Sequence, residues 1–144
     1  MVKPRLFIDA DVLFAGSFAP SAYGASEVLL RMSEITLIEA LTSEQVLTEV
    51  ERNLTAKAPT ALAPFRFLVS RCLKVVPNPT LEAIRAHQGR ADPKDLPILV
   101  AALREGCPYL ITFNVRHFQP GHPQLTVLRP GDFLARIRGQ LSNL

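Results

Sequence analysis

DPKDLPILVAALREGCPYLITFNVRHF, residues 92–118, is the stretch that best defines the fold. Residues Leu96–Leu103 are apolar on nearly every side of a helix, which predicts a buried helix that stops at Gly106. The apolar run Tyr109–Thr112 then predicts a strand. This stretch therefore predicts a helix that packs against a buried sheet.

Outward from this stretch, short apolar strands alternate with helices along the chain. Strands are predicted at Leu6–Ile8, Ile35–Ile38, Leu73–Val76 and Thr126–Leu128. Helices are predicted over about 21–33, from Thr42 or Ser43 to about Lys57, over Phe65–Cys72, from Pro79 toward Gly89, and from about Pro130. This order indicates the α/β class, with a parallel sheet covered by helices on both faces. No repeat or linker interrupts residues 1–144, so we expect a single domain.

Composition excludes several classes of protein. The 144 residues are 48% hydrophobic and 20% charged, as in globular proteins, and no apolar stretch approaches the roughly 20 residues that cross a bilayer. Asp9 and Asp11 interrupt the apolar run near the N-terminus, which makes it a poor signal peptide, so we expect a cytoplasmic protein with no membrane partner. The net charge of +3 is compatible with a nucleic-acid partner. Cys72 and Cys107 have no C-x-x-C spacing and are expected to be buried thiols.

Acidic side chains occupy the positions where an open parallel sheet places its functional site, at the carboxyl ends of the strands. These residues, with one amide, are Asp9 and Asp11 after the first strand, Asn114 after Tyr109–Thr112, Asp92 and Asp95 before the buried helix, and Glu49 and Glu51 on the helix that follows the second strand. Converging carboxylates repel one another unless a cation lies among them. Oxygen ligands of this kind suit Mg²⁺ or Mn²⁺, which activates water for phosphodiester hydrolysis.

Most of these acids also have a structural interpretation. Asp11 is in a position typical of a turn former or helix cap. Asp92 is followed by proline, as an N-cap often is, and a helix that begins later would make Asp95 the cap. Helical periodicity does not choose between Glu49 and Glu51, because the two flank the apolar stripe on opposite sides. The residues alone therefore leave an acidic metal site as one of two interpretations.

The order of these motifs resembles the PIN-domain family. FIDADVLFAG (7–16) is similar to its opening strand and catalytic Asp, and SEQVLTEVERNL (43–54) to its helix with an acidic Glu. DPKDLPILVAAL (92–103) and GCPYLITFNVRHF (106–118) are similar to its most specific stretch, and LTVLRPGDFLARI (125–137) to its closing strand and helix. The resemblance implies a three-layer α/β/α fold with a parallel sheet of about five strands. It further implies a Mg²⁺- or Mn²⁺-dependent endoribonuclease that hydrolyses RNA.

Carried over residue by residue, the resemblance assigns Asp9, Glu49 and Asp95 to catalysis and to the metal, with Asp92 as an extra metal ligand. The family's fourth acidic position falls on Asn114, whose carbonyl oxygen can still ligate a metal or orient a water. Thr112 would support the site through its hydroxyl. Among bacterial members this layout implies a VapC-like toxin of a type II toxin–antitoxin pair. Its expected partners are RNA, a small antitoxin and a second copy of the chain.

Two other functions compete with this one. FIDADVL imitates the Asp-x-Asp motif of haloacid-dehalogenase-like phosphatases, although Leu13 departs from that motif. Asn114 instead motivates a catalytically inactive PIN fold that binds RNA or a protein partner. His117 and His122 are interpreted as loop histidines and not as a metal pair, because the proline and glycine between them break any helix.

Overall fold

The structure is a computed structural model that describes residues 3–18 and 24–142. Its strands are β1 (Arg5–Ile8), β2 (Glu39–Ser43), β3 (Leu73–Val76), β4 (Tyr109–Ile111) and β5 (Thr126–Leu128). Its α-helices are α1 (Ala10–Phe18), α2 (Ala25–Glu34), α3 (Glu44–Lys57), α4 (Leu62–Cys72), α5 (Leu81–Ala86), α6 (Leu96–Arg104) and α7 (Pro130–Ser142), with short 3-10 helices η1 (Pro59–Ala61) and η2 (Val115–Phe118). The helix predicted over 21–33 is confirmed as α2, and residues 21–23 lie outside the described residues.

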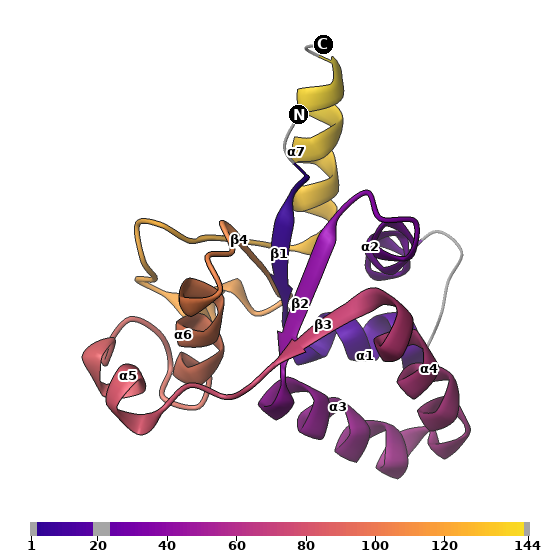
Figure 1. The fold of residues 1–144 in the computed structure, drawn as a ribbon, viewed down its shortest axis with the longest axis horizontal. Helices are drawn as coiled ribbons and strands as arrows, with labels where there is room; N and C mark the ends of the chain where they lie inside the picture. The colour runs from indigo at the N-terminus through magenta and orange to yellow at the C-terminus, as the bar shows by residue number, and fades with distance from the viewer. Residues whose placement is uncertain (1–2, 19–23, 143–144) are drawn as a thin grey trace.

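The described strands form one five-stranded sheet in the order β3-β2-β1-β4-β5, and all of its pairs are parallel (Figure 1). Strands β2 and β3 extend the sheet from β1 in one direction, and β4 and β5 extend it in the other. The order reverses between β1 and β4, where Ile8 pairs with Ile111. In open α/β sheets, ligands bind outside the carboxyl ends of the strands at this reversal.

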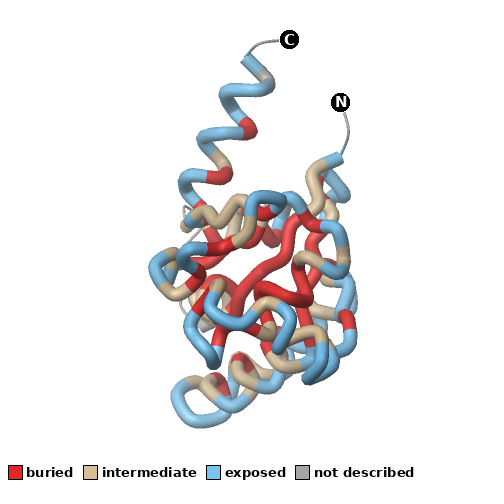
Figure 2. Tube along the Cα trace, turned by 90° about the vertical axis from the view of Figure 1, so that its left-hand side faces the viewer, coloured by how far each residue is buried: buried red, intermediate tan, exposed pale blue. Residues whose placement is uncertain are grey.

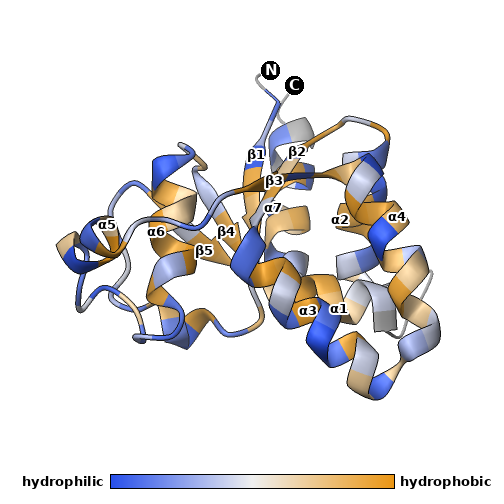
Figure 3. Ribbon diagram, turned by 60° about the horizontal axis from the view of Figure 1, so that its bottom comes forward, coloured by the Kyte–Doolittle hydropathy of each residue, from blue (hydrophilic) through white to orange (hydrophobic). Residues whose placement is uncertain are grey.

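Helices cover both faces of the sheet, which confirms the predicted three-layer α/β/α architecture. Helices α5 and α6 lie on one side, and α1, α2, α3 and α4 lie on the other (Figures 1 and 3). The strands form the buried centre, with Leu6, Phe7, Leu41 and Leu110 fully buried (Figure 2). Because both faces of the sheet are covered, the central strands are apolar without alternation, as Leu6–Ile8 of β1 and Tyr109–Ile111 of β4 show.

Local sequence signals explain the two helices that carry the predicted acids. Ser43 is the N-cap of α3, since its hydroxyl accepts a hydrogen bond from the backbone N–H of Val46. Helix α6 is buried along most of its length, and Gly106 follows it with φ +69°, a conformation that glycine adopts without strain. The predicted helices over 42–57 and 96–103 are therefore confirmed.

The strand predicted at Ile35–Ile38 is wrong, because the strand begins at Glu39. Residues 35–37 form the C-terminal cap of α2 instead. The backbone N–H of Thr36 donates to Ser33 and that of Leu37 donates to Met32, which is the pattern of a Schellman motif. The cap turns the chain so that Ile35 and Leu37 are exposed, and their β-branched or apolar character is therefore not a sign of a strand.

Thr36→Gly should stabilise the protein by roughly 0.5–1 kcal/mol. Thr36 has φ +62°, in the left-handed region that an L side chain adopts only with strain, and the entropy lost by glycine offsets part of the relief. Denaturant unfolding of the two chains measures the difference. Thr36→Ala keeps a Cβ and should show no gain, and a glycine variant that is less stable than wild type would contradict this account of the cap.

The two cysteines agree with the expectation of buried thiols. Cys72 and Cys107 are both buried and both free. Burial raises the pKa of the Cys107 thiol to about 11, so this thiol is not a nucleophile at neutral pH. Within the described ranges, no helix combines the length and apolar character that a membrane span requires.

Candidate functional site

Asp9 lies at the carboxyl end of β1, directly beside the end of β4. Its side chain accepts two hydrogen bonds, one at Oδ1 from the backbone N–H of Ala10 at 2.7 Å and one at Oδ2 from the Thr112 hydroxyl at 2.8 Å. Asp9 is only 6% exposed. Burial, and next the negative charge of Asp11, raise the pKa of Asp9 to about 7. Asp9 is therefore a buried carboxyl group that ionises near neutral pH.

Asp11 joins the end of β1 to the end of β4. It lies in the first turn of α1, and its Oδ2 accepts hydrogen bonds from the backbone N–H of Phe113 at 3.0 Å and from the Asn114 side-chain amide at 3.1 Å. The helix-cap interpretation of Asp11 is therefore wrong, because its carboxylate binds another strand's end. Burial is the main cause that raises the pKa of Asp11. This contact between positions 11 and 114 is distant in sequence, and no local pattern predicts it.

Asn114 follows β4, as the sequence predicts, and its amide nitrogen faces Asp11. Its backbone N–H also donates to the Thr112 hydroxyl oxygen at 3.1 Å. Thr112 is fully buried and bonds Asp9, so Asn114, Thr112 and Asp9 form one connected chain of hydrogen bonds. A role for the Asn114 carbonyl oxygen as a metal ligand stays a prediction.

Asp95 occupies the N-cap position of α6, but its side chain makes no capping hydrogen bond. It is 8% exposed, and burial is the main cause that raises its pKa. The negative charge of Asp95 also contributes, as the smallest of the causes, to the raised pKa of Asp9. Asp92 is exposed at the start of the same loop. Asp95 is thus a buried carboxylate that does not cap the helix.

His117 lies next to Asp95, a contact that sequence analysis missed. Its Nδ1 is 3.2 Å from Asp95 Oδ2. The backbone explains the contact, because the N–H of Asp92 donates to the carbonyl oxygen of His117 at 2.8 Å and so joins the two loops. A helix and a strand separate these residues in the sequence, so no local pattern predicts the contact. The only feature that drew attention to this region was the family motif GCPYLITFNVRHF, which contains His117.

Glu49 and Glu51 lie on α3 but have different surroundings. Glu49 lines a cavity of about 480 Å³ together with Asp95, and the basic residues Arg52 and Lys94 line the same cavity. Glu51 turns away and forms an ion pair with Arg66 of α4 at 3.0 Å. Figure 3 turns the carboxyl ends of the strands toward the viewer, with α6 on one side and α1 and α3 on the other. Glu49 is therefore the glutamate that faces the predicted site.

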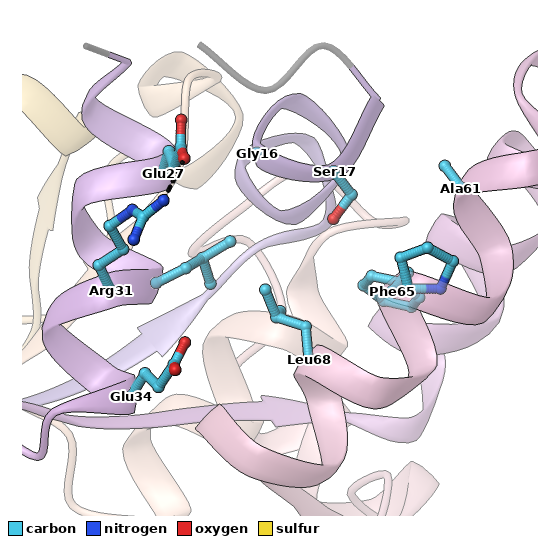
Figure 4. Close-up of a pocket in the computed structure, with 10 residues that line it drawn as sticks. Gly16, Ser17, Glu27, Arg31, Glu34, Ala61, Phe65 and Leu68 are labelled. Atoms are coloured by element: carbon cyan, nitrogen blue, oxygen red, sulfur yellow. Dashed lines mark hydrogen bonds and ion pairs between the residues drawn. The ribbon is translucent and has the colours of Figure 1, made fainter. Parts of the chain in front are cut away.

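A second cavity lies between α1, α2 and α4, away from these acids (Figure 4). Its volume is about 270 Å³, and Ser17, Phe65 and Leu68 are among the residues that line it. Glu27 forms an ion pair with Arg31 at 3.2 Å at its edge. None of the predicted site residues lines this cavity, so it adds nothing to the acidic site.

Asp9→Asn should stabilise the metal-free protein above pH 7 and leave it nearly unchanged at pH 4. The folded pKa of about 7 lies above the ordinary aspartate value of 3.8, so the folded chain binds the proton more tightly than the unfolded chain. Stability is then fully present below about pH 4 and falls as pH rises through about 7, by up to roughly 4 kcal/mol. Urea unfolding in chelator at several pH values measures the slope. A wild-type slope that equals the variant's slope would contradict a raised pKa.

Fold and site together define an α/β protein with buried carboxylates at the point where its parallel sheet reverses order. The family model described as "PIN domain" matches residues 5–116, which is most of the chain. The chain belongs to the PIN-domain family, and the resemblance seen in its sequence motifs is confirmed. This result leaves the haloacid-dehalogenase alternative without support.

Solved structures share the fold at low sequence identity. A chain from the VapBC2 complex of Rickettsia felis, solved with a DNA fragment from its promoter, has a TM-score of 0.64 at 15% identity, with 85% of this chain and 96% of that chain covered. A toxin–antitoxin complex from Klebsiella pneumoniae gives 0.63 at 17%, covering 84% and 95%. The VapC20 toxin of Mycobacterium tuberculosis, which cleaves the sarcin-ricin loop, gives 0.52 at 16%, covering 73% and 86%. Among curated proteins, no sequence matches significantly.

Proposed function

We propose that this protein is a metal-dependent endoribonuclease and the toxin of a toxin–antitoxin pair. The observation that carries the proposal is the pair of buried carboxylates, Asp9 at the end of β1, where the sheet order reverses, and Asp95 at the start of α6. Buried acids raise the energy of the folded chain when their charge is poorly compensated, and functional sites are where proteins keep them. Family membership supports the same function.

The residues present fit a divalent ion. Asp95 Oδ2 is buried and has no hydrogen-bond partner within the described part of the chain, and Glu49 lines the same cavity as Asp95. Asp9 is the further carboxylate that we propose for the site. Asp92 is the proposed additional ligand. Such a donor set suits Mg²⁺ or Mn²⁺, which when bound polarises a phosphodiester and lowers the pKa of a bound water. The site thus offers the chemistry that hydrolysis of RNA needs.

The surrounding residues hold the carboxylates and the substrate in place. The Thr112 hydroxyl fixes the orientation of Asp9, and Asp11 fixes the end of β4 next to it. Arg52 and Lys94 share a cavity with Glu49 and Asp95, where they would neutralise phosphates of the RNA backbone. The cavity therefore combines acids that hold a cation with bases that hold an anionic polymer.

The test of the activity is cleavage of a structured RNA by the purified chain. Cleavage should require Mg²⁺ or Mn²⁺ and should stop when a chelator is added. Undiminished cleavage in chelator would overturn the metal mechanism. Bound Mg²⁺ without any cleavage would instead favour the inactive module as the function of this fold.

The toxin assignment rests on the fold shared with toxin–antitoxin chains. We propose a small antitoxin as partner, and expression of the chain alone should slow cell growth. Co-expression with the product of a short neighbouring reading frame should restore growth, and growth inhibition that Asp95→Asn fails to relieve would contradict an enzymatic toxin. The homodimer implied by the resemblance stays a prediction, which sedimentation of the purified chain would test.

Asn114→Asp should weaken the metal-free protein more than Asn114→Ala does. The Asn114 amide nitrogen lies 3.1 Å from Asp11 Oδ2, so a carboxylate in its place would set two negative charges against each other. Alanine only removes the hydrogen bond, at a cost of about 1–2 kcal/mol. Thermal melts in chelator and in Mg²⁺ measure both effects. Mg²⁺ should recover more stability in the aspartate variant, and equal recovery in both variants would place position 114 outside the site.

A further inference from the structure

We propose that Asp92, Asp95 and His117 form a second cation site, with one nitrogen ligand, that takes a first-row transition-metal ion in preference to Mg²⁺. It adjoins the Asp9 and Glu49 side of the proposed nuclease site and shares Asp95 and the additional ligand Asp92 with it. The inference rests on the proposed function only for the role of the ion, because binding itself can be measured without RNA.

The three side chains converge on one point. Each offers one ligand atom, and these atoms all lie within 4.8 Å of one another. His117 Nδ1 and Asp95 Oδ2 are 3.2 Å apart. Two neighbouring ligands of an octahedral ion with bonds of about 2.1 Å would be about 3.0 Å apart. The apo spacing is therefore close to the spacing that one ion requires.

Asp95 Oδ2 lacks the hydrogen-bond donor that its burial demands. Its Oδ2 is buried, and no group in residues 3–18 or 24–142 donates a hydrogen bond to it. The nearby His117 nitrogen is at ion-pair distance but outside hydrogen-bond geometry. Asp95 also leaves the start of α6 uncapped. A buried carboxylate oxygen with no donor is costly, and a bound cation would supply the missing interaction.

The backbone holds the three ligands in place before any ion arrives. The N–H of Asp92 donates to the carbonyl of His117 at 2.8 Å, and the N–H of Asp95 donates to the carbonyl of Asp92 at 2.9 Å. The N–H of His117 donates to the carbonyl of Asn114 at 3.0 Å, within η2. Solvent reaches the cluster from one side, because Asp92 is exposed and the His117 side chain is 39% exposed. An ion can therefore enter without rearrangement of the fold.

The imidazole ligand sets the preference for the ion. Mg²⁺ prefers oxygen ligands and keeps its waters, whereas imidazole suits first-row transition metals. A set of two carboxylates and one imidazole should therefore favour Mn²⁺ over Mg²⁺, and ions later in the row over Mn²⁺. The acids of the neighbouring site offer oxygen only, so the two sites should differ in ion preference.

The test is pulsed electron paramagnetic resonance of the full chain loaded with Mn²⁺. Wild type should show the magnetic coupling of a directly bound nitrogen nucleus. His117→Gln should lose this coupling and weaken Mn²⁺ binding on the order of 10-fold, while Mg²⁺ binding stays unchanged. His122→Gln, in a histidine outside the cluster, is the matched control and should keep the coupling. Asp92→Asn, at an exposed position, should also weaken Mn²⁺ binding and guards against a folding defect at position 117.

The possible outcomes separate this inference from the proposed function. No Mn²⁺ binding, no nitrogen coupling in wild type, or coupling that persists in His117→Gln would each overturn the second site. Mg²⁺-dependent RNA cleavage alongside any of these results would leave the proposed nuclease intact. Nitrogen coupling in a chain that cleaves no RNA would support the metal site and overturn the nuclease.

Discussion

Replacing Asp95 with Asn should lower the rate of RNA cleavage by about 100-fold or more. Asparagine has nearly the same size, so the change removes the negative charge of a side chain that is 8% exposed and leaves the packing of α6 in place. The loss should therefore come from weaker metal binding and poorer activation of water. Initial rates on a single RNA substrate, measured at saturating Mg²⁺ and at limiting Mg²⁺, give the size and the origin of the effect.

The control for this variant is Asp132→Asn. Asp132 is exposed in the first turn of α7 and does not line the cavity that Glu49 and Asp95 share. It carries the same change of charge, so any general electrostatic effect on RNA binding would appear in both variants. Asp95→Asn should melt at the same temperature as wild type or higher, because burial of the Asp95 carboxylate, which raises its pKa, makes the charged form costly in the folded chain. Wild-type cleavage by Asp95→Asn would remove Asp95 from the mechanism.

The second large effect is expected for Glu49→Gln, at about 10- to 100-fold in cleavage rate. Glu49 lines the same cavity as Asp95, so it faces the ion that Asp95 would hold. Glutamine keeps the length of the side chain and one carbonyl oxygen, and it removes the charge that attracts the cation. The expected loss is therefore smaller than for Asp95, and a higher Mg²⁺ concentration should recover part of it. Rates over a range of Mg²⁺ concentrations measure both properties.

Glu51→Gln is the matched control on the same helix. It breaks an exposed ion pair with Arg66, which is worth at most about 1 kcal/mol, and leaves the cavity unchanged. Its cleavage rate should equal that of wild type. Equal losses for Glu49→Gln and Glu51→Gln would show that α3 contributes only overall negative charge, and a loss confined to Glu51→Gln would reverse the assignment of the two glutamates.

The fold follows from the sequence where local patterns decide the structure. The apolar run of α6, the stop at Gly106 and the cap at Ser43 each act over a few residues, so sequence patterns predict them well. The short apolar strands predict a parallel sheet because both of its faces are covered by helices. The error at Ile35–Ile38 arose because β-branched and apolar residues also occur in the exposed cap of a helix.

The site depends more on contacts that are distant in sequence. Asp9 and Asp95 could be predicted from their positions at the ends of elements, whereas the bond between Asp11 and Asn114 depends on the pairing of β1 with β4. His117 meets Asp95 because two loops exchange a backbone hydrogen bond. Glu49 and Glu51 are equivalent by helical spacing, and they are distinguished by the ion pair of Glu51 with α4 and by the cavity that Glu49 shares with Asp95.

The most direct test of the central claim is a calorimetric titration of the wild-type chain with Mg²⁺ at pH 6 and at pH 8. The carboxyl group of Asp9 ionises near pH 7, so it is mostly protonated at pH 6 and mostly charged at pH 8. Binding should be tighter at pH 8 and should release close to one proton at pH 6, and Asp9→Asn should abolish both the pH dependence and the proton release. Mg²⁺ binding with the same affinity and no proton release in both chains, or no binding at either pH, would contradict an acidic metal site built around Asp9.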